Sequence, residues 1–472
     1  MSDPPVIDRT RVPSPDDVLA RARELRRQLS GGFREEAVKS LYAEAERVAR
    51  RAVSHDGAGV DLDQRIDRLV TSPWLGLPIM LVLLAVVFWL TIAGANVPSA
   101  MLASGLFWIE DQAAAGFDAV GVPWWITGFL WHGVYRGLAW VVSVMLPPMA
   151  IFFPLFTIFE DLGYLPRVAF NLDFLFRRAG AHGKQALTMA MGFGCNAAGV
   201  IATRIIDSPR ERLVAILTNN FVPCNGRYPT LIMLGTIFVG ASFAPALASL
   251  AAAAAVVGVV VLGIGFTLLM SWVLSRTILR GEASAFTLEL PPYRRPSVGR
   301  IFYTSLIDRT LFVLWRAMWT AAPAGAVIWV LANVRWGDTT LAALSAGWLD
   351  PLGRAIGLDG VILLAYVIAI PANEIVVPTL VMAYLGTGMM TEMEGLGDLR
   401  RLLVDQQGWT MLTAVNLMLF SLLHNPCATT ILTIYKETLS ARWATLGALM
   451  PLGMAFLVCF LTATIARALG WG

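Results

Sequence analysis

Three cysteines lie in short strings that contain Gly or Pro, and each has an asparagine within two positions. The strings are Gly192–Asn196 (GFGCN), Pro223–Asn225 (PCN) and Asn425–Cys427 (NPC). Thiolate sulfur together with amide and carboxylate oxygen suits a borderline divalent transition metal better than Mg²⁺ or Ca²⁺. Cys195, Cys224 and Cys427 are therefore candidate metal ligands, with the alternative that each is a small apolar residue. That alternative is our interpretation of Cys459, which has no such neighbours.

Glu374 is the candidate acidic ligand, because it lies in an apolar stretch that runs from Gly360 to Thr391. A charged side chain at the centre of a membrane helix costs about 3 kcal/mol on insertion scales, so such residues mark functional sites by default. The alternative is a structural glutamate that pairs with Arg227 or with a backbone donor. His424 is a further candidate ligand, with a hydrogen-bonded core histidine as the alternative. Auxiliary oxygen donors along a polar pathway would be Asn196, Asn225, Asn373 and Asn425.

The amino-acid composition indicates that these candidate residues belong to a membrane protein. Of 472 residues 57% are hydrophobic and 15% are charged, whereas soluble domains have about 45–50% apolar and about 25% charged residues. A soluble enzyme, a nucleic-acid binder and a disordered scaffold are excluded for the chain as a whole. The net charge of +3 is too small to indicate a polyanion partner. We expect an all-α polytopic membrane protein with about seven to nine membrane segments.

Loop charges divide the chain and orient it, because Lys and Arg concentrate on the cytoplasmic side. The expected parts are a soluble charged helical segment (1–72, with helices near 16–29 and 33–53), a first membrane half (73–276), a basic cytoplasmic linker (277–316) and a second membrane half (317–472). The N-terminus is expected in the cytoplasm. Residues 94–135 hold no Lys or Arg but hold Glu110, Asp111 and Asp118, so we expect an outer loop there.

Two apolar segments are expected to enter the membrane and return. Residues 185–203 lie between two basic loops, and 360–385 lie between two acidic ones. Each is followed by a span that carries a Pro-Cys pair, at 213–238 and 408–435. Opposite entry sides predict an inverted repeat of two gate modules, whose broken helices meet near the bilayer midplane. The alternative is that Gly and Pro only kink ordinary spanning helices.

Several strings resemble the membrane (gate, or nucleoside-recognition) domain of the bacterial ferrous iron transporter B family. They are Arg65–Leu69, Gly76–Pro78, Leu155–Phe170 (LFTIFEDLGYLPRVAF), His182–Lys184, Gly192–Arg204, Pro223–Arg227, Pro371–Glu374 and Pro426-Cys427, within about residues 60–466. The resemblance implies uptake of Fe²⁺ as the transported substrate through Cys195, Cys224, Cys427 and Glu374. It implies no permanently bound cofactor, and a place in the bacterial inner membrane.

The chain departs from that family in one respect. The family begins with a GTP-binding domain, whose phosphate loop reads G-x-x-x-x-G-K-[ST], and no such string occurs here. We therefore expect a split form without GTPase activity and without catalytic residues. Its expected partners are a separate small GTPase subunit and a small SH3-like cytoplasmic protein, and a homo-oligomer is left open.

Two other functions are compatible with the residues. Gate modules of this type also resemble those of nucleoside transporters, so the first alternative is a carrier of a nucleoside-like organic solute. Three cysteines at the breaks disfavour it. The second is a non-transporting membrane protein, either a scaffold or a thiol enzyme in which His424 is the base for Cys427.

Overall fold

The computed structural model describes residues 17–19, 21, 24, 33–52, 62–72, 74–280, 293–391, 393 and 395–470. The chain forms two compact units, Met1–Leu62 with Ser284–Glu289, and Asp63–Ala283 with Leu290–Gly472. In the first unit α2 occupies Phe33–Ala52. The helix expected near 16–29 lies largely outside the described residues. The second unit, called here the membrane unit, holds every candidate site residue.

The membrane unit is helical apart from one short hairpin. Its first half contains α3 (Leu62–Val70), α4 (Gly76–Ala119), α5 (Trp124–Thr127), η1 (Gly128–Tyr135), α6 (Arg136–Asp161), α7 (Tyr164–Arg178), α8 (Gln185–Gly194), α9 (Asn196–Ala202), η2 (Thr203–Ile205), α10 (Pro209–Thr218), η3 (Asn219–Phe221), η4 (Asn225–Arg227), α11 (Tyr228–Leu234), η5 (Gly235–Val239), η6 (Gly240–Ser242) and α12 (Pro245–Arg276). Its second half contains α13 (Val298–Phe302), η7 (Tyr303–Leu311), α14 (Phe312–Asn333), the antiparallel strands β1 (Arg335–Trp336) and β2 (Thr339–Thr340), α15 (Leu341–Ala355), α16 (Gly360–Ile368), η8 (Asn373–Ile375), α17 (Val376–Leu385), α18 (Leu396–Arg400), η9 (Arg401–Gln406), α19 (Met411–Leu423), α20 (Ala428–Thr438) and α21 (Ala441–Ala468).

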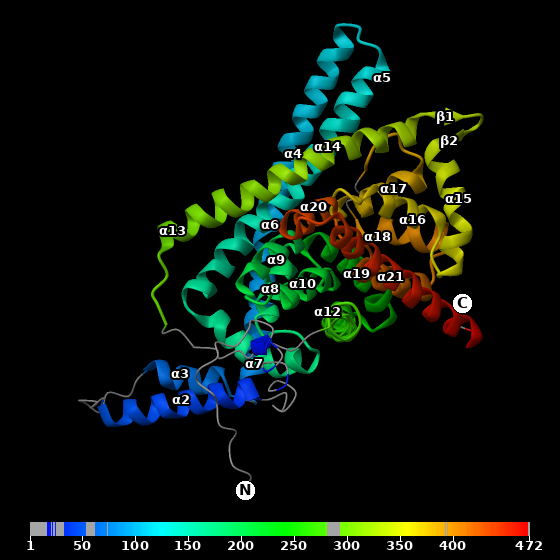
Figure 1. Ribbon diagram of the computed structural model, residues 1–472. Coiled ribbons are helices and arrows are strands. Elements are labelled where there is room, and N and C mark those ends of the chain that lie inside the picture. The colour runs from blue at the N-terminus through cyan, green and yellow to red at the C-terminus, as the bar shows by residue number, and fades with distance from the viewer. Residues whose placement is uncertain are drawn as a thin grey trace. The chain divides into compact units, whose positions relative to one another are not determined.

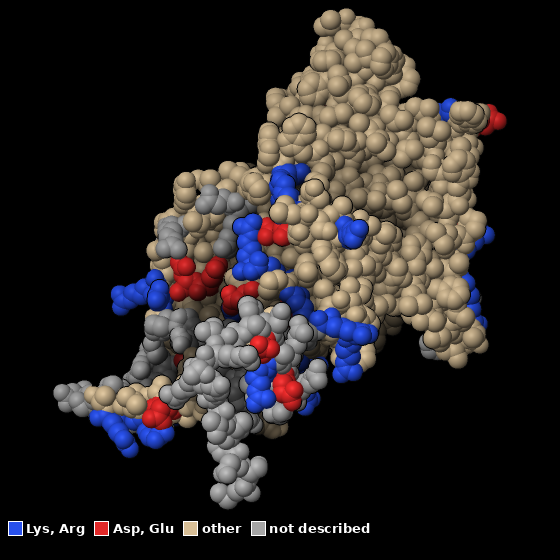
Figure 2. Space-filling view, viewed as in Figure 1, with Lys and Arg blue, Asp and Glu red and all other residues tan. Residues whose placement is uncertain are grey.

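Among the described residues, six helical segments are long and apolar enough to cross a bilayer, or seven if the pair α15 and α16, bent by 112°, forms one span. The six are Gly76–Ala119, Trp124–Asp161, Leu247–Arg276, Tyr303–Asn333, Met411–Thr438 and Ala441–Ala468. The upper part of the face in Figure 2 is almost bare of charge. Large apolar side chains such as Trp89, Leu250 and Ile465 are exposed on the surface of the membrane unit. A surface of this kind fits lipid.

The expectation that residues 94–135 form a loop is wrong, whereas their place on the outer side stays a prediction. Helix α4 continues without a break to Ala119, and its 44 residues make it about 66 Å long. That is twice the thickness of about 30 Å of the hydrocarbon core. In Figure 1 the ends of α4 and α5 project together from the membrane unit. Loop charge reports the side of the membrane and not the secondary structure, so the charge pattern could not indicate this helical extension.

The first gate module contains a hairpin. Helix α8 ends at Gly194, Cys195 has extended backbone (φ −154°, ψ 122°), and α9 follows at once. A Cβ at Gly199 in α9 would lie 2.8 Å from the carbonyl oxygen of Thr188 in α8. The two helices therefore pack side by side, and the segment turns back instead of continuing across.

The second module repeats the arrangement. Helix α16 stops at Ile368, and after the break η8 and α17 lead back. The hydroxyl of Tyr384, near the end of α17, donates to Oδ2 of Asp359 just before α16, at 2.5 Å. The fold-class prediction of two modules with broken, re-entrant helices is confirmed, and for these two segments the alternative of kinked spanning helices is wrong.

Helix α14 crosses η1 and α6 at very short range. A Cβ at Gly137 would lie 2.9 Å from the Cα of Gly325, and one at Gly133 would lie 2.9 Å from the Cβ of Trp329. A Cβ at Gly325 would overlap the carbonyl oxygen of Gly133. Only glycine permits this contact, which joins the first membrane half directly to the second.

Helix α3 is fixed to α7 by a buried arginine. Arg167 is 1% exposed, and its Nε and Nη2 donate to the two carboxylate oxygens of Asp67 at 2.9 and 3.1 Å. Tyr293 donates its hydroxyl to Asp67 at 2.9 Å, and the guanidinium lies 4.2 Å from the centre of the Tyr293 ring. We call the end of the membrane unit formed by α3 and α7 the α7 face.

Candidate functional site

The two hairpins bring their breaks to mid-membrane depth. Helix α8 has 10 residues and is about 15 Å long, half the hydrocarbon thickness. Helix α16 has 9 residues and is about 14 Å long. Irregular backbone at this depth is stable only where protein covers it or where it lines a polar cavity. Cys195 and Asn373 are 8% and 6% exposed, in agreement with that requirement.

A cavity of about 30 Å³ lies where the broken segments meet. Its polar lining comes from both modules and consists of Cys195, Asn196, Cys224, Asn225, Asn373, Glu374, Cys427, Thr429 and Thr430. One water needs about 10–15 Å³ of such space, so the cavity has room for an ion with few waters. Among the described residues, no three His, Cys, Asp or Glu side chains converge closely enough to hold one metal ion.

Glu374 lies against a residue of the other module. Its carboxylate packs on Gly226, where an added Cβ would overlap it. No cation forms an ion pair with Glu374 among the described residues. The alternative in which Arg227 neutralises this carboxylate is therefore wrong.

Arg227 instead connects the two Pro-Cys breaks. It is 1% exposed, and its Nη1 donates to the carbonyl oxygens of Asn220 (2.9 Å) and Leu422 (2.7 Å). Its Nη2 donates to Asn220 Oδ1 at 3.1 Å and to the carbonyls of His424 and Asn425 at 3.2 and 3.4 Å. Three carbonyls near the break after α19, those of Leu422, His424 and Asn425, therefore each accept a hydrogen bond from this guanidinium.

Asparagine amides extend the connection to the first hairpin. Asn196 Nδ2 donates to Asn220 Oδ1 at 3.2 Å, and Asn220 Nδ2 donates to the carbonyl of His424 at 2.8 Å. Asn219, whose role the sequence did not suggest, donates to the carbonyl of Asn196 at 3.1 Å. Asn373 Nδ2 lies 4.0 Å from Sγ of Cys224. The amides therefore hold the backbone of the breaks as well as line the cavity.

Three residues named from the sequence lie outside the cavity lining. His424 donates from Nδ1 to the carbonyl of Ser421 at 2.9 Å, and its Nε2 is 3.2 Å from Asn373 Oδ1, as a hydrogen-bonded core histidine would. Asn425 donates to the carbonyl of Pro426 at 3.3 Å. Cys459 is fully buried and donates to the carbonyl of Asn416 at 3.4 Å.

Thr429 and Thr430 are lining residues that sequence reasoning missed. The Thr430 hydroxyl lies 3.3 Å from Sγ of Cys427. Both threonines follow the Pro-Cys pair by one helical turn or less, so their spacing on α20 was the available signal.

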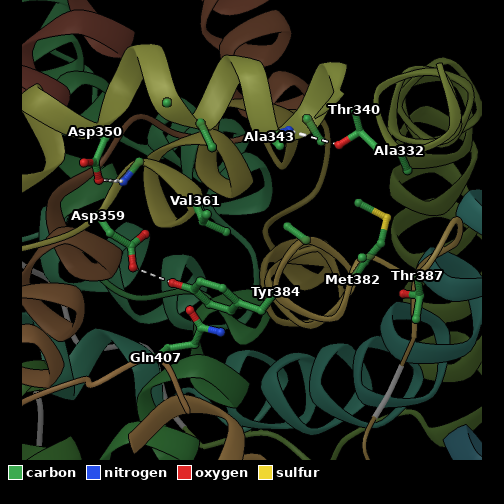
Figure 3. Close-up of a pocket in the computed structure, with 16 residues that line it drawn as sticks. Ala332, Thr340, Ala343, Asp350, Asp359, Val361, Met382, Tyr384, Thr387 and Gln407 are labelled. Carbon is green, nitrogen blue, oxygen red and sulfur yellow. Dashed lines mark hydrogen bonds between the residues drawn. The ribbon is translucent and has the colours of Figure 1, made fainter. Parts of the chain in front are cut away.

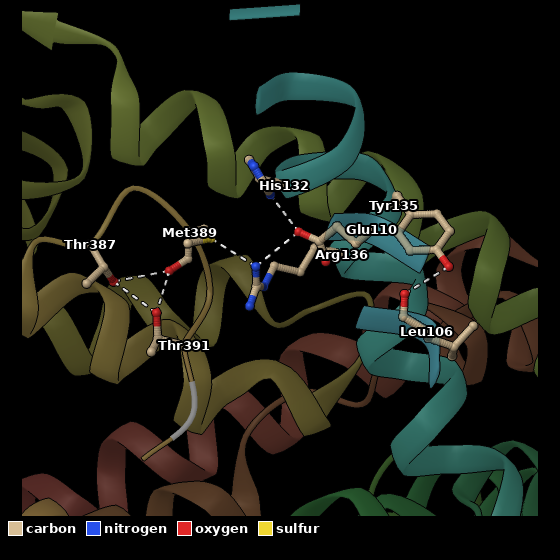
Figure 4. A network of polar contacts seen from close by, with 8 residues as sticks. All are labelled: Leu106, Glu110, His132, Tyr135, Arg136, Thr387, Met389 and Thr391. Atoms are coloured by element: carbon tan, nitrogen blue, oxygen red, sulfur yellow. Dashed lines mark hydrogen bonds and ion pairs between the residues drawn. The ribbon is translucent and has the colours of Figure 1, made fainter. Parts of the chain in front are cut away.

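A buried acidic network outside the cavity was also missed. Glu110 is fully buried, and its Oε1 accepts from Arg136 at 3.0 Å and lies 2.6 Å from His132 Nδ1. Arg136 also contacts Met389 Sδ at 2.9 Å (Figure 4). These residues join α4 to the start of α6 and to the loop after α17. Glu110 is therefore a structural residue of the helix pair, although the sequence placed it in a loop.

In another cavity that is lined by acidic residues, the carboxylates already accept hydrogen bonds or form ion pairs within the protein. It measures about 460 Å³ and lies among α15, α16 and α17 (Figure 3). Asp359 accepts from the backbone NH of Ile362 at 2.7 Å as well as from Tyr384. Asp350 accepts from the NH of Gly360 at 3.2 Å and pairs with Arg354 at 2.6 Å. These carboxylates fix the bend between α15 and α16.

Two protein-family models match parts of the chain. The Gate family model, described as nucleoside recognition, matches residues 142–238 and 314–441. These ranges contain both hairpins and both Pro-Cys breaks. The model of the ferrous iron transport protein B C terminus matches residues 256–308. No solved structure matches the chain.

Individual relatives agree with the family models. The chain is 28% identical over 423 residues to the Fe(2+) transporter FeoB of Staphylococcus aureus strain MSSA476, which covers 84% of this chain and 58% of that relative. It is 26% identical over 436 residues to the Campylobacter jejuni Fe(2+) transporter FeoB, covering 89% and 68%. A Porphyromonas gingivalis Fe(2+) transport protein A/FeoB fusion protein is 26% identical over 85% of this chain and 51% of its own length. The chain thus spans somewhat more than half of the Staphylococcus relative. What the chain matches is the FeoB membrane (Gate) domain, with its two Gate segments, together with the FeoB C terminus.

Proposed function

We propose that this chain carries Fe²⁺ across the bacterial inner membrane through the cavity between the two gate modules. One observation carries the proposal: three thiols and one carboxylate, contributed by four separate breaks, line a single cavity of about 30 Å³. Sulfur and oxygen donors together suit a borderline divalent metal. The names of the relatives, Fe(2+) transporter FeoB, agree with this cargo.

In the proposed mechanism the ion loses most of its water and exchanges it for thiolate, carboxylate and amide ligands. The ligands Cys195, Cys224, Cys427 and Glu374 belong to different breaks, and in this conformation no three of them converge. Dispersed ligands bind an ion weakly enough to release it, which conduction requires. A membrane potential of 100 mV, negative inside, supplies about 4.6 kcal/mol for a divalent cation.

The same proposal covers orientation and partners. The N-terminus and the α7 face would lie in the cytoplasm, since Arg167, Arg177 and Arg178 are near that face.

Because the 472 residues contain no phosphate-loop string, GTP hydrolysis would be performed by a GTPase outside them. That GTPase would gate the path instead of driving the ion. A small SH3-like protein is the second proposed partner. The Porphyromonas relative is named as a fusion of Fe(2+) transport protein A with FeoB, which supports a further protein acting beside the membrane part.

The volume of the cavity between the two gate modules favours a metal ion over an organic solute as the transported substrate. Sites for organic ligands usually measure about 300–1,000 Å³, ten times or more the cavity between the modules. A nucleoside therefore does not fit at the breaks in this conformation, despite the description of the Gate family.

Radioactive iron uptake by cells that produce single variants tests the proposal. We expect Cys195→Ser and Cys224→Ser to lower the rate of ⁵⁵Fe²⁺ uptake severely at matched protein level. Cys459→Ser is the matched control, since Cys459 is buried away from the cavity, and it should retain wild-type uptake. Wild-type rates in both cavity variants would refute the ligand roles.

A further inference from the structure

A second, much larger cavity adjoins the first. It measures about 410 Å³ and lies between α4, α6, α11 and η5. Its lining residues with polar side chains are Asn96, Ser99, Asn225, Tyr228 and Thr236. Asn225 lines both this cavity and the small one at the breaks, so its side chain stands at the junction between them. We call the larger cavity the vestibule.

The vestibule lies far from the α7 face. Asn96 is 20 residues beyond Gly76, where α4 begins next to α3. At helical rise this distance is about 30 Å, which is the full thickness of the hydrocarbon core. The vestibule therefore reaches the opposite side of the membrane, where α4 and α5 project. Asn96 is also exposed in the structure, and an exposed amide at this position fits contact with water better than contact with lipid tails.

Toward the α7 face the path is closed by aromatic rings. Phe152 packs against Gly194, where a Cβ would overlap its ring, and it stacks on Phe156 at 5.7 Å between centres. Phe153 and Phe193 are 0% and 2% exposed. These rings lie on α6 and α8 between the breaks and Asp161, which ends α6 near α7. Apolar constrictions of this kind stop ions because water does not enter them.

We propose that the vestibule is the access route of the hydrated divalent cation, and that the structure is the state open to the side opposite the α7 face. Asn225 is the specificity-determining residue at its inner end. The available space falls from about 410 to about 30 Å³ at this side chain. An ion that passes it must lose most of its waters, and the Asn225 amide oxygen is in place to replace one of them. This inference rests on the proposed function for the identity of the ion, but not for the position of the route.

Cysteine modification tests the route. Ser99→Cys adds a thiol to the vestibule wall, and Val97→Cys adds one two residues away on the same helix. Val97 is 67% exposed and does not line the vestibule, so its thiol lies at the same level of α4 as that of Ser99→Cys but outside the cavity. The probe is the membrane-impermeant cation methanethiosulfonate ethyltrimethylammonium, applied to intact cells. Wild-type protein with its four native cysteines gives the baseline.

We expect Ser99→Cys to be modified in intact cells and the modification to lower ⁵⁵Fe²⁺ uptake several-fold, with recovery after treatment with a reductant. Val97→Cys should keep the wild-type rate of ⁵⁵Fe²⁺ uptake after the same treatment, whether or not its thiol is modified, because it lies outside the vestibule. Three results would overturn the route: no modification of Ser99→Cys, modification only in inverted vesicles, or modification without any change in uptake. If wild-type protein takes up no iron, the proposed function fails, and the side and extent of labelling still decide whether the vestibule holds water.

Discussion

Cys195 and Ala372 have the same backbone conformation, with φ −154° and ψ 122° at Cys195 and φ −153° and ψ 121° at Ala372. Each is followed by an asparagine, Asn196 or Asn373, that lines the central cavity. The two residues are thus equivalent positions of the repeat, one in each hairpin. At this position only the first hairpin carries a thiol, so the two hairpins offer different donors to the cavity although their backbones correspond.

This equivalence predicts the effect of Ala372→Cys. The variant would add a fourth thiol to the cavity lining at a position whose backbone already accepts cysteine. We expect purified protein to bind Zn²⁺ more tightly and cells to take up iron more slowly, because tighter ligation delays release. Calorimetric titration with Zn²⁺ and uptake of ⁵⁵Fe²⁺ measure the two effects. Ala372→Ser, of similar size without the sulfur, is the control, and equal Zn²⁺ affinity of the two variants would contradict the prediction.

Gly226→Ala tests the position of Glu374. An added methyl group would overlap the carboxylate and displace it from the cavity, so uptake should fall as far as it does in Glu374→Gln. Gly105→Ala adds the same methyl group to α4 at a position with no atom within 4 Å and should leave uptake unchanged. Normal uptake in Gly226→Ala would mean that the carboxylate is not required where the structure has it.

Arg227→Met tests the connection between the modules. The variant would leave the carbonyls of Asn220 and Leu422 without their donor, and each unpaired buried group costs about 1–3 kcal/mol. We expect a large drop in the midpoint of thermal unfolding in detergent. Arg401→Met removes an exposed ion pair with Asp398, which is worth about 1 kcal/mol or less, and should change the midpoint little. Equal midpoints for the two variants would argue against the connection.

The contact between Asp67 and Arg167 predicts a pH dependence of stability. The hydrogen bond from Arg167 holds the pKa of Asp67 below its ordinary value, so the charged carboxylate stabilises the folded protein. That contribution is complete above the ordinary pKa of about 3.9 and is lost as the pH falls through the lower, folded-state value.

The midpoint of thermal unfolding of Asp67→Asn should therefore lie below that of the wild type at neutral pH, and the difference should shrink under acid conditions. Asp118→Asn, at an exposed position near the end of α4, provides the comparison for general effects of acid. A difference that stays constant from pH 7 to pH 3 would show that the carboxylate charge does not contribute.

The hairpins could be predicted from the sequence because their signals are local. Charge-free stretches between loops of one charge type, with Gly, Pro and Asn in the middle, gave 185–203 and 360–385, and the structure has α8 with α9 over 185–202 and α16 with α17 over 360–385. The partners of Arg227 could not be predicted in this way. They are backbone carbonyls about 200 residues away, and a carbonyl has no signature in the sequence.

The hydrogen-bond partners of Glu110 could not be predicted from the sequence either. Its partners His132 and Arg136 follow by 22 and 26 residues, and they meet it only because α4 extends past the bilayer and packs against η1 and α6. A charge count treats all three as separate surface charges. The need for glycine at position 226 could not be predicted for the same reason, because it arises from contact with a carboxylate of the other module.

The glycine crossing of α14 with η1 and α6 restricts how the two halves can move. Where backbones touch without intervening side chains, one helix cannot slide along the other, because the next residue in either direction brings a bulky group such as Trp329 into the contact. Gly133, Gly137 and Gly325 thus fix the register of the first membrane half against the second.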